Sequence, residues 1–235
     1  MFKKFTRVLM FTVISLSLMM CSISYAANDN LDTSQPVLDS TKELAISKSS
    51  NVNLDAIHAF LDKLDKDSKN KTNNLTPAAS SYGAAWPYKA TSSTSVNCYG
   101  YAANFGWFLN PGDIYYYYGS PIVDGDSVNT IATYVLQDLG RAGRTSRIIS
   151  SATASVNSDE YRMALRVGQD SNVYDYHFML QCSDGGWCEK HGSSPSIYDG
   201  NINPSTFSWN LYYTDGTLYK SNFYNSATVY FAVKK

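Results

Sequence analysis

The sequence predicts an α+β domain in which helices precede an antiparallel β-sheet. Before about residue 145, apolar residues recur at helical spacing. After it, short runs rich in β-branched and aromatic residues are separated by clusters of Gly, Asn, Ser and Asp. Helices first and strands afterwards is the order expected when helices cover one face of an antiparallel sheet.

The first residues have the composition of a secretory signal peptide. A basic start, Met1–Arg7, is followed by an apolar stretch over residues 8–20 and by small residues up to Ala26. The apolar stretch is too short for a membrane span, and no other stretch approaches the roughly 20 apolar residues that a span requires. We therefore expect residues 1–26 to be removed, leaving a secreted chain, extracellular or periplasmic, without stable membrane insertion.

Composition excludes several classes of function. The whole chain has 19 basic and 20 acidic residues, and loss of Lys3, Lys4 and Arg7 with the signal leaves 16 against 20, a net charge of -4. This balance argues against a nucleic-acid binder. No His or Cys cluster has metal-ligand spacing and no glycines form a phosphate-binding loop, so we expect neither a metal nor another cofactor. The 19 tyrosines suit an extracellular, β-rich domain.

Residues 27–80 differ from the rest of the chain in being polar. Within them, residues 54–64 carry apolar side chains at helical spacing and predict a short amphipathic helix. Two interpretations stay open for this segment. It is a propeptide or tether, or it is an ordered helix packed on the main domain, which we place at residues 81–235.

The main domain begins with two expected helices. Asn97 is placed to cap a helix from Cys98 to about Phe108, and Asp126-Ser127 caps a second one that ends at Gly140. Between them, Tyr115 to Tyr118 is interpreted as a strand or an aromatic loop. The strand candidates that follow span residues 145–150, 161–167, 173–181, 187–190 and 227–233.

The cysteines divide into a pair and a single thiol. Cys21 leaves with the signal, so Cys98, Cys182 and Cys188 remain, and an odd count leaves one thiol free. Cys182 and Cys188 flank a turn-rich run and are spaced to face each other across a hairpin. A disulfide there would stabilise the fold by roughly 2 kcal/mol.

Cys98 is then the unpaired thiol, at the position where a helix begins. The helix dipole and the free N–H groups there favour an anion, so we expect a lowered pKa for the thiol. Backbone N–H groups around Asn97 and Tyr99 are candidate oxyanion donors. His177 lies in an apolar strand, where an imidazole is costly without a partner, and is the candidate base. The alternative is a buried, inert thiol beside a structural histidine.

Two segments resemble bacterial papain-like domains related to the NlpC-type and CHAP-type cell-wall hydrolases. Asn97-Cys98-Tyr99-Gly100-Tyr101-Ala102 is similar to their N-C-Y-A-Y-A segment. Asp175-Tyr176-His177-Phe178, with the Ser-Asp-Gly-Gly-Trp run at 183–187, is similar to their D-Y-H-F segment and the S-D-G-x-W that follows. The resemblance spans about residues 95–200. It implies a papain-like fold, with the Cys98 helix packed on an antiparallel sheet, and a Cys–His site.

The third catalytic residue departs from the resembled pattern. In that pattern a second histidine follows the first by twelve positions and orients it, whereas this chain has Glu189 there. A carboxylate can also accept the imidazole N–H, so Glu189 is our candidate for the orienting role. His191 is the reserve candidate, followed by Gln181 and Asp184. By strand parity, Cys182 and Cys188 point away from the face that carries His177.

These features predict a secreted cysteine hydrolase that cleaves a peptide or isopeptide bond through Cys98, His177 and Glu189. Peptidoglycan peptide is the substrate that the resemblance implies. Two different functions remain open. One is that of a non-catalytic domain that binds glycan, cell wall or a host protein through its aromatic surface. The other is that of a secreted toxin or effector that acts on a host protein.

Overall fold

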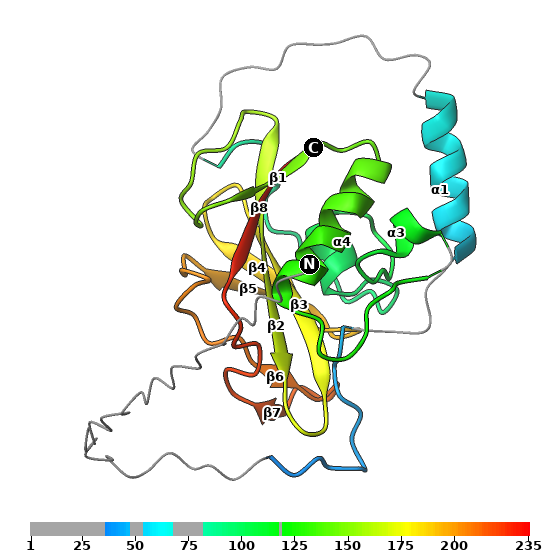
Figure 1. Ribbon diagram of the computed structural model, residues 1–235. Coiled ribbons are helices and arrows are strands. Elements are labelled where there is room, and N and C mark those ends of the chain that lie inside the picture. The colour runs from blue at the N-terminus through cyan, green and yellow to red at the C-terminus, as the bar shows by residue number, and fades with distance from the viewer. Residues whose placement is uncertain (1–35, 48–53, 68–81, 118) are drawn as a thin grey trace, which may run out of the picture. The chain divides into compact units, whose positions relative to one another are not determined.

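A six-stranded antiparallel sheet forms the centre of the computed structural model, which describes residues 36–47, 54–67, 82–117 and 119–235 (Figure 1). Its strand order is β1-β8-β2-β3-β4-β5, and all neighbouring strands are antiparallel. The strands are β1 (Ser146–Ile149), β2 (Glu160–Gln169), β3 (Tyr174–Gln181), β4 (Trp187–Lys190), β5 (Ser196–Gly200) and β8 (Val229–Lys234). This architecture confirms the predicted α+β class and the antiparallel sheet.

One face of the sheet, called here the helix face, is covered by α2 (Cys98–Ala102) and α4 (Val128–Arg141). The apolar stripe of α4 packs on alternate residues of β2 and β8, and α2 packs on β3 and β4. The side chains of β3 that point to this face are Tyr174, Tyr176, Phe178 and Leu180. Figure 1 shows α4 lying across the central strands.

The other face, called the hairpin face, is covered by β6 (Leu211–Tyr212), β7 (Leu218–Lys220) and the loops around them. Here the core is largely aromatic, with Trp187, Trp209, Tyr219, Phe223, Tyr224 and Tyr230 among its buried residues. Successive side chains of a strand point to opposite faces. His177 therefore points to the hairpin face, whereas its neighbours Tyr176 and Phe178 point to the helix face.

The helix that begins at Cys98 is shorter than predicted. It ends at Ala102, after five residues, instead of running to about Phe108. Asn104 adopts the left-handed region at φ 53°, and the chain then turns back over the helix. A Cβ on Gly100 would lie 1.9 Å from the carbonyl oxygen of Trp107, so only glycine accommodates this return.

Two further expectations about the elements were wrong. For the run Tyr115 to Tyr118 we expected a strand or an aromatic loop, but Tyr115 and Tyr116 belong to the short helix α3 (Asp113–Tyr116), which Gly112 precedes in the left-handed region. Tyr117 follows the helix, and Tyr118 lies outside the described residues. The second helix continues past Gly140 to Arg141, and Ser127 caps it by accepting a hydrogen bond from the N–H of Thr130. Three strands, β5, β6 and β7, were not predicted at all.

The described part of the polar N-terminal region belongs to the same compact unit as the sheet. The predicted amphipathic helix is α1 (Leu54–Asp67). Ile57 and Leu61 of α1 are buried in the helix-face core, and the ring of Phe60 packs edge-on against Trp107 at 5.4 Å. Residues 1–26, the expected signal peptide, lie outside the described residues. No helix among the residues described has the length and apolar character needed to cross a membrane.

A buried carboxylate connects the helices. Asp138 of α4 accepts hydrogen bonds from the Tyr99 hydroxyl at 3.1 Å, the Gly112 N–H at 2.8 Å and the Tyr115 N–H at 2.8 Å. It is fully buried. Asp138 thereby ties α4 to α2, which carries Cys98, and to α3.

Replacement of this carboxylate is expected to destabilise the domain strongly. Asp138→Ala leaves three donors without their acceptor, each costing about 1 kcal/mol or more, so we expect a loss of about 3 kcal/mol in the free energy of unfolding. Urea denaturation measures it. The exposed Thr133→Ala on the same helix is the control and should change stability by less than about 0.5 kcal/mol. Equal effects of the two substitutions would contradict this role of Asp138.

Candidate active site

Asn97 positions Cys98 by binding the chain on both sides of it. Its side-chain oxygen accepts the N–H of Gly100 at 3.0 Å, which caps α2, and also the N–H of Leu109 at 3.3 Å. Its amide nitrogen donates to the carbonyl oxygens of Leu109 at 2.6 Å and Ser47 at 2.9 Å. Cys98 is therefore the first residue of a capped helix, held rigidly against β3.

The Cys98 thiol is fully buried, and its surroundings differ from the expected ones. It donates to the Ser47 hydroxyl oxygen at 3.0 Å, and the carbonyl oxygen of Tyr176 lies 3.9 Å from the sulfur. Burial raises the pKa of the Cys98 thiol well above its usual range, and the hydrogen bond to Ser47 opposes this only in part. The prediction of a lowered pKa is wrong for this form of the protein, because lost hydration outweighs the dipole of a five-residue helix.

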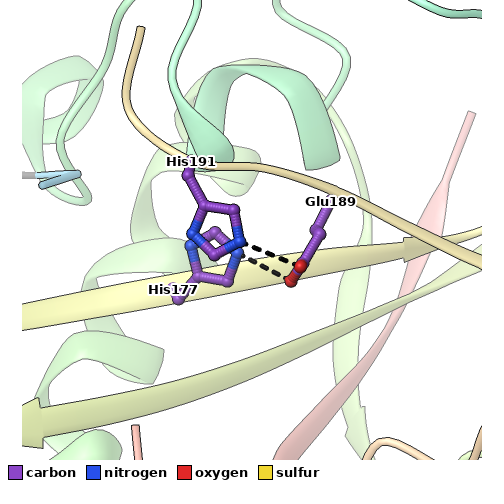
Figure 2. Close-up of side chains that lie close together, drawn as sticks. All are labelled: His177, Glu189 and His191. Carbon is purple, nitrogen blue, oxygen red and sulfur yellow. Dashed lines mark hydrogen bonds and ion pairs between the residues drawn. The ribbon is translucent and has the colours of Figure 1, made fainter. Parts of the chain in front are cut away.

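His177, Glu189 and His191 form a buried cluster on the hairpin face (Figure 2). Each carboxylate oxygen of Glu189 contacts one imidazole. Oε2 lies 2.9 Å from Nε2 of His177, and Oε1 lies 2.9 Å from Nε2 of His191. The imidazole rings are stacked, with centroids 4.2 Å apart and planes 6° apart. The antiparallel pairing of β3 with β4 places Glu189 opposite Met179. Met179 follows His177 by two residues in β3, so its side chain points to the same face of the sheet.

The charge distribution fixes which ring nitrogen carries the proton. The two imidazoles hold the pKa of Glu189 below its usual range against the effect of burial, so this carboxylate only accepts hydrogen bonds. Burial and the nearby His191 lower the pKa of His177 to about 4. A neutral His177 that donates from Nε2 has a lone pair on Nδ1. That Nδ1 is buried and has no hydrogen-bond partner among the described residues.

The cluster does not fit a metal ion as it is placed. An imidazole binds a metal in the plane of its ring, and two rings stacked face to face have no common point in both planes. Zinc also prefers tetrahedral geometry with ligand nitrogens about 2.0 Å from the ion. The geometry is instead that of a carboxylate shared by two imidazole donors.

The structure joins His177 to Glu189, as predicted for an oriented base, but does not bond His177 to Cys98. Within the described part of the chain, the Cys98 thiol is hydrogen-bonded to Ser47 and Tyr176. The thiol lies in the helix-face core against the carbonyl of Tyr176, the residue before His177, whereas the imidazole of His177 points to the hairpin face. The reserve candidate His191 bonds the same carboxylate rather than His177 itself.

Gln181 and Asp184, the remaining candidates for the orienting role, lie away from His177. Gln181 accepts from Arg162 Nη1 at 2.7 Å and donates to the carbonyl of Gly185. Asp184, in the turn after β3, accepts from the Tyr198 hydroxyl at 2.7 Å. Neither side chain bonds either imidazole of the cluster.

Three residues that sequence reasoning did not assign complete the site. Asp175 accepts the N–H of Ser47 at 3.0 Å with both carboxylate oxygens, and the Tyr224 hydroxyl at 2.7 Å. The Tyr224 ring stacks on His177 at 5.1 Å. Asp175 stood in the resembled motif and could have been noticed there. Ser47 lies in a polar segment with no signal of its own.

Cys182 and Cys188 pack in the helix-face core, on the side of the sheet opposite His177 and Glu189. Their sulfur atoms lie 2.6 Å apart, and both residues are thiols in the structure. The predicted disulfide therefore stays a prediction.

Comparisons with known proteins add no assignment, because no protein-family model, curated protein or solved structure matches this chain.

The neutral state of His177 predicts how the cost of replacing it depends on pH. Its folded pKa lies below the ordinary 6.5, so its neutral form contributes stability above pH 6.5 that is lost as the pH falls towards 4. His177→Gln removes this dependence. As the pH falls from 7 to 5, wild type loses stability that the variant keeps. The difference in the free energy of unfolding, variant minus wild type, should therefore rise by on the order of 2 kcal/mol.

Urea denaturation at each pH measures this difference. The raised pKa values of Asp113, Asp138 and Asp199 act with the opposite sign, but they are common to both chains and cancel. Met179→Leu, on the same strand face, is the control and should cost the same at both pH values. A His177→Gln difference that does not change with pH would show that His177 is not held neutral.

Proposed function

We propose that this protein is a secreted cysteine hydrolase that cleaves an amide bond, with Cys98 as nucleophile, His177 as base and acid, and Glu189 as the orienting residue. The observation that carries the proposal is the state of His177. Its Nε2 is bonded to Glu189 and its Nδ1 is unpartnered among the described residues, and the carbonyl of the preceding residue, Tyr176, contacts the Cys98 thiol. A base held in one tautomer by a third group is the arrangement that activates a nucleophile.

The proposed reaction has two steps. His177 Nδ1 takes the proton of the Cys98 thiol, and the sulfur attacks the amide carbonyl carbon. His177 then gives that proton to the leaving amine, and an acyl-enzyme thioester remains. Water, deprotonated by the same nitrogen, releases the acid and restores the thiol. Glu189 stabilises the imidazolium that forms in each step, and backbone N–H groups at the start of α2, near Asn97 and Tyr99, are the proposed donors to the oxyanion.

The substrate proposal rests on the motifs of the sequence. The segments around Cys98 and His177 resemble papain-like cell-wall hydrolases, which favours a papain-like fold and peptidoglycan peptide as the substrate. Export by a signal peptide would place the enzyme where that substrate is found.

The observed form of the site is latent under this proposal. The thiol is buried and protonated, and its hydrogen bond goes to Ser47 instead of an imidazole. Departure of Ser47 is therefore required before Cys98 and His177 can act together.

Site variants test the proposal when hydrolysis of cell-wall peptides and unrelated peptides is followed by mass spectrometry. Cys98→Ala and His177→Ala should each reduce turnover by roughly a thousandfold or more, because the residues act as one unit. Glu189→Gln should reduce it by roughly a hundredfold, since an amide still accepts the Nε2 proton but does not stabilise the imidazolium.

The double substitution of Cys182 and Cys188 by Ala is the matched control for loss of thiols and should retain turnover in the folded protein. Undiminished turnover by Cys98→Ala would contradict the proposal. Modification of a host protein with unchanged cell-wall peptides would keep the chemistry and redirect the substrate towards a toxin or effector.

One observation favours a second candidate, a non-catalytic binding domain. A cavity of about 520 Å³ on the helix face is lined by the aromatic side chains of Trp86, Tyr88 and Tyr101. Aromatic walls of this kind suit sugar rings or apolar side chains. Binding to cell wall that survives Cys98→Ala and is lost in Tyr101→Ala would favour this candidate.

A further inference from the structure

The segment Glu43–Ser47 packs on the domain with one β-bridge residue, Leu44, and no regular strand. Ala45 and Ser47 are buried, with 2% and 0% of their surface exposed, whereas Ile46 between them is 37% exposed. Alternate burial is the pattern of a strand with one face against the protein. This segment, which belongs to the polar N-terminal region of the sequence, therefore has one buried face.

Main-chain hydrogen bonds attach this segment to the end of β6 and to the residues that follow it. The N–H of Ala45 donates to the carbonyl of Tyr212 at 2.9 Å, and the N–H of Thr214 donates to the carbonyl of Glu43 at 2.8 Å. Between these bonds, Leu44 forms an antiparallel bridge with Tyr213. The segment therefore pairs through a single antiparallel bridge beside the two-stranded β6–β7 sheet, a short form of the strand addition by which many proteins bind an extended peptide.

On its other side, the main chain of the segment passes close to Gly192. A Cβ on Gly192 would lie 2.7 Å from the carbonyl oxygen of Ile46 and 3.1 Å from the carbonyl carbon of Ala45. Gly192 is also in the left-handed region, at φ 43°. A side chain at position 192 would collide with the main chain of the segment, so glycine here leaves room for a peptide main chain.

At its end the segment meets the candidate active site. The Ser47 N–H is held by both oxygens of Asp175, and its carbonyl oxygen accepts from Asn97 Nδ2 at 2.9 Å. The hydroxyl, instead of the carbonyl carbon, faces the Cys98 sulfur at 3.0 Å. Side chains on the domain thus hold the main chain of Ser47, while its own side chain covers the nucleophile.

We infer that the path between Tyr212–Thr214 and Gly192, which leads to Cys98, is the peptide-binding groove of the enzyme, and that the chain's own residues Glu43–Ser47 occupy it as an internal inhibitor. The inference rests on the proposed function for the role of Cys98, but the contacts of Glu43–Ser47 with the domain are observed independently of any activity. Release or displacement of the segment opens Cys98 to substrate. The Ser47 carbonyl is held by Asn97 away from attack, which explains how the segment blocks the site without being cut there.

The occupant also indicates the class of substrate. Recognition through main-chain N–H and carbonyl groups selects an extended peptide. The two buried positions hold Ala45 and Ser47, so small side chains fit there. Peptides with alanine or another small residue next to the cleaved bond are the class that the groove favours.

Displacing the segment in the full-length mature chain tests the inference. Ala45→Arg forces a charged side chain into a buried position, whereas Ile46→Arg places the same side chain in solvent and is the matched control. We expect iodoacetamide to label Cys98 at least tenfold faster in Ala45→Arg than in wild type, and no faster in Ile46→Arg. Mass spectrometry of the peptide that contains Cys98 separates its labelling from that of Cys182 and Cys188.

Two additions keep the test decisive. Near-ultraviolet circular dichroism establishes that each variant is folded, and Ala45→Pro, which removes the N–H donated to Tyr212, replaces Ala45→Arg if the latter unfolds. A synthetic peptide of residues 36–47, added to the folded variant, should restore protection of Cys98. Wild-type labelling rates in both folded variants would overturn the inference.

The same samples separate this inference from the proposed function. Accelerated labelling of Cys98 with hydrolysis of alanine-containing peptides supports both. Accelerated labelling without any hydrolysis upholds the peptide groove and its occupant but contradicts the hydrolase.

Discussion

The buried carboxylate of Glu189 constrains the centre of this protein. A charge enclosed on the hairpin face must be met by hydrogen-bond donors, and two imidazole Nε2–H groups meet it at 2.9 Å. This requirement fixes the tautomer of His177 and aligns the two rings in a stack. It also leaves the Nδ1 lone pair of His177 unused, which is the property that a base requires. If either imidazole carried its proton on Nδ1 instead, a lone pair on Nε2 would face the carboxylate.

Strand β3 connects this cluster with the nucleophile. Successive side chains of β3 point to opposite faces, so Tyr176 and Phe178 lie on the helix face and His177 lies on the hairpin face. The carbonyl of Tyr176 then faces the Cys98 sulfur, while the next residue binds Glu189. Asp175, one residue earlier, binds Ser47 and Tyr224. Three consecutive residues of one strand thus contact the thiol, the base's partner and the covering segment, so the site depends on the register of β3.

Sequence reasoning succeeded where the signal was local. Asn97 was recognised as a cap because its residue type and position suffice, and the strands around His177 followed from their apolar runs. The length of α2 was missed because Asn104 and the return of Trp107 over Gly100 are tertiary features. β6 has two residues and β7 three, too few for any periodicity. The predicted shift of the Cys98 pKa had the wrong direction, because the sequence does not show that a distant serine covers the thiol.

The placement of Ser47 was the least predictable feature. Its contacts join residues 50 to 129 positions apart, and the sequence around it, with Ile46 before it and Lys48 after it, carries no motif. Only the assembled fold shows that Asn97 serves both the helix cap and the Ser47 carbonyl. The interpretations of the N-terminal region as propeptide and as packed segment are therefore compatible. A segment can be ordered on the domain and still block access to the Cys98 thiol.

The central claim is that one groove brings an extended peptide to Cys98 and His177. The most direct measurement is a crystal structure of the Ala45→Arg chain after reaction with an alanine-rich peptide chloromethyl ketone. The account predicts a covalent bond from the inhibitor to the Cys98 sulfur, main-chain pairing of the peptide with Tyr212 and Thr214, and His177 Nδ1 facing the reacted sulfur. An inhibitor bound elsewhere, or a His177 ring still separated from the sulfur by protein atoms, would contradict it.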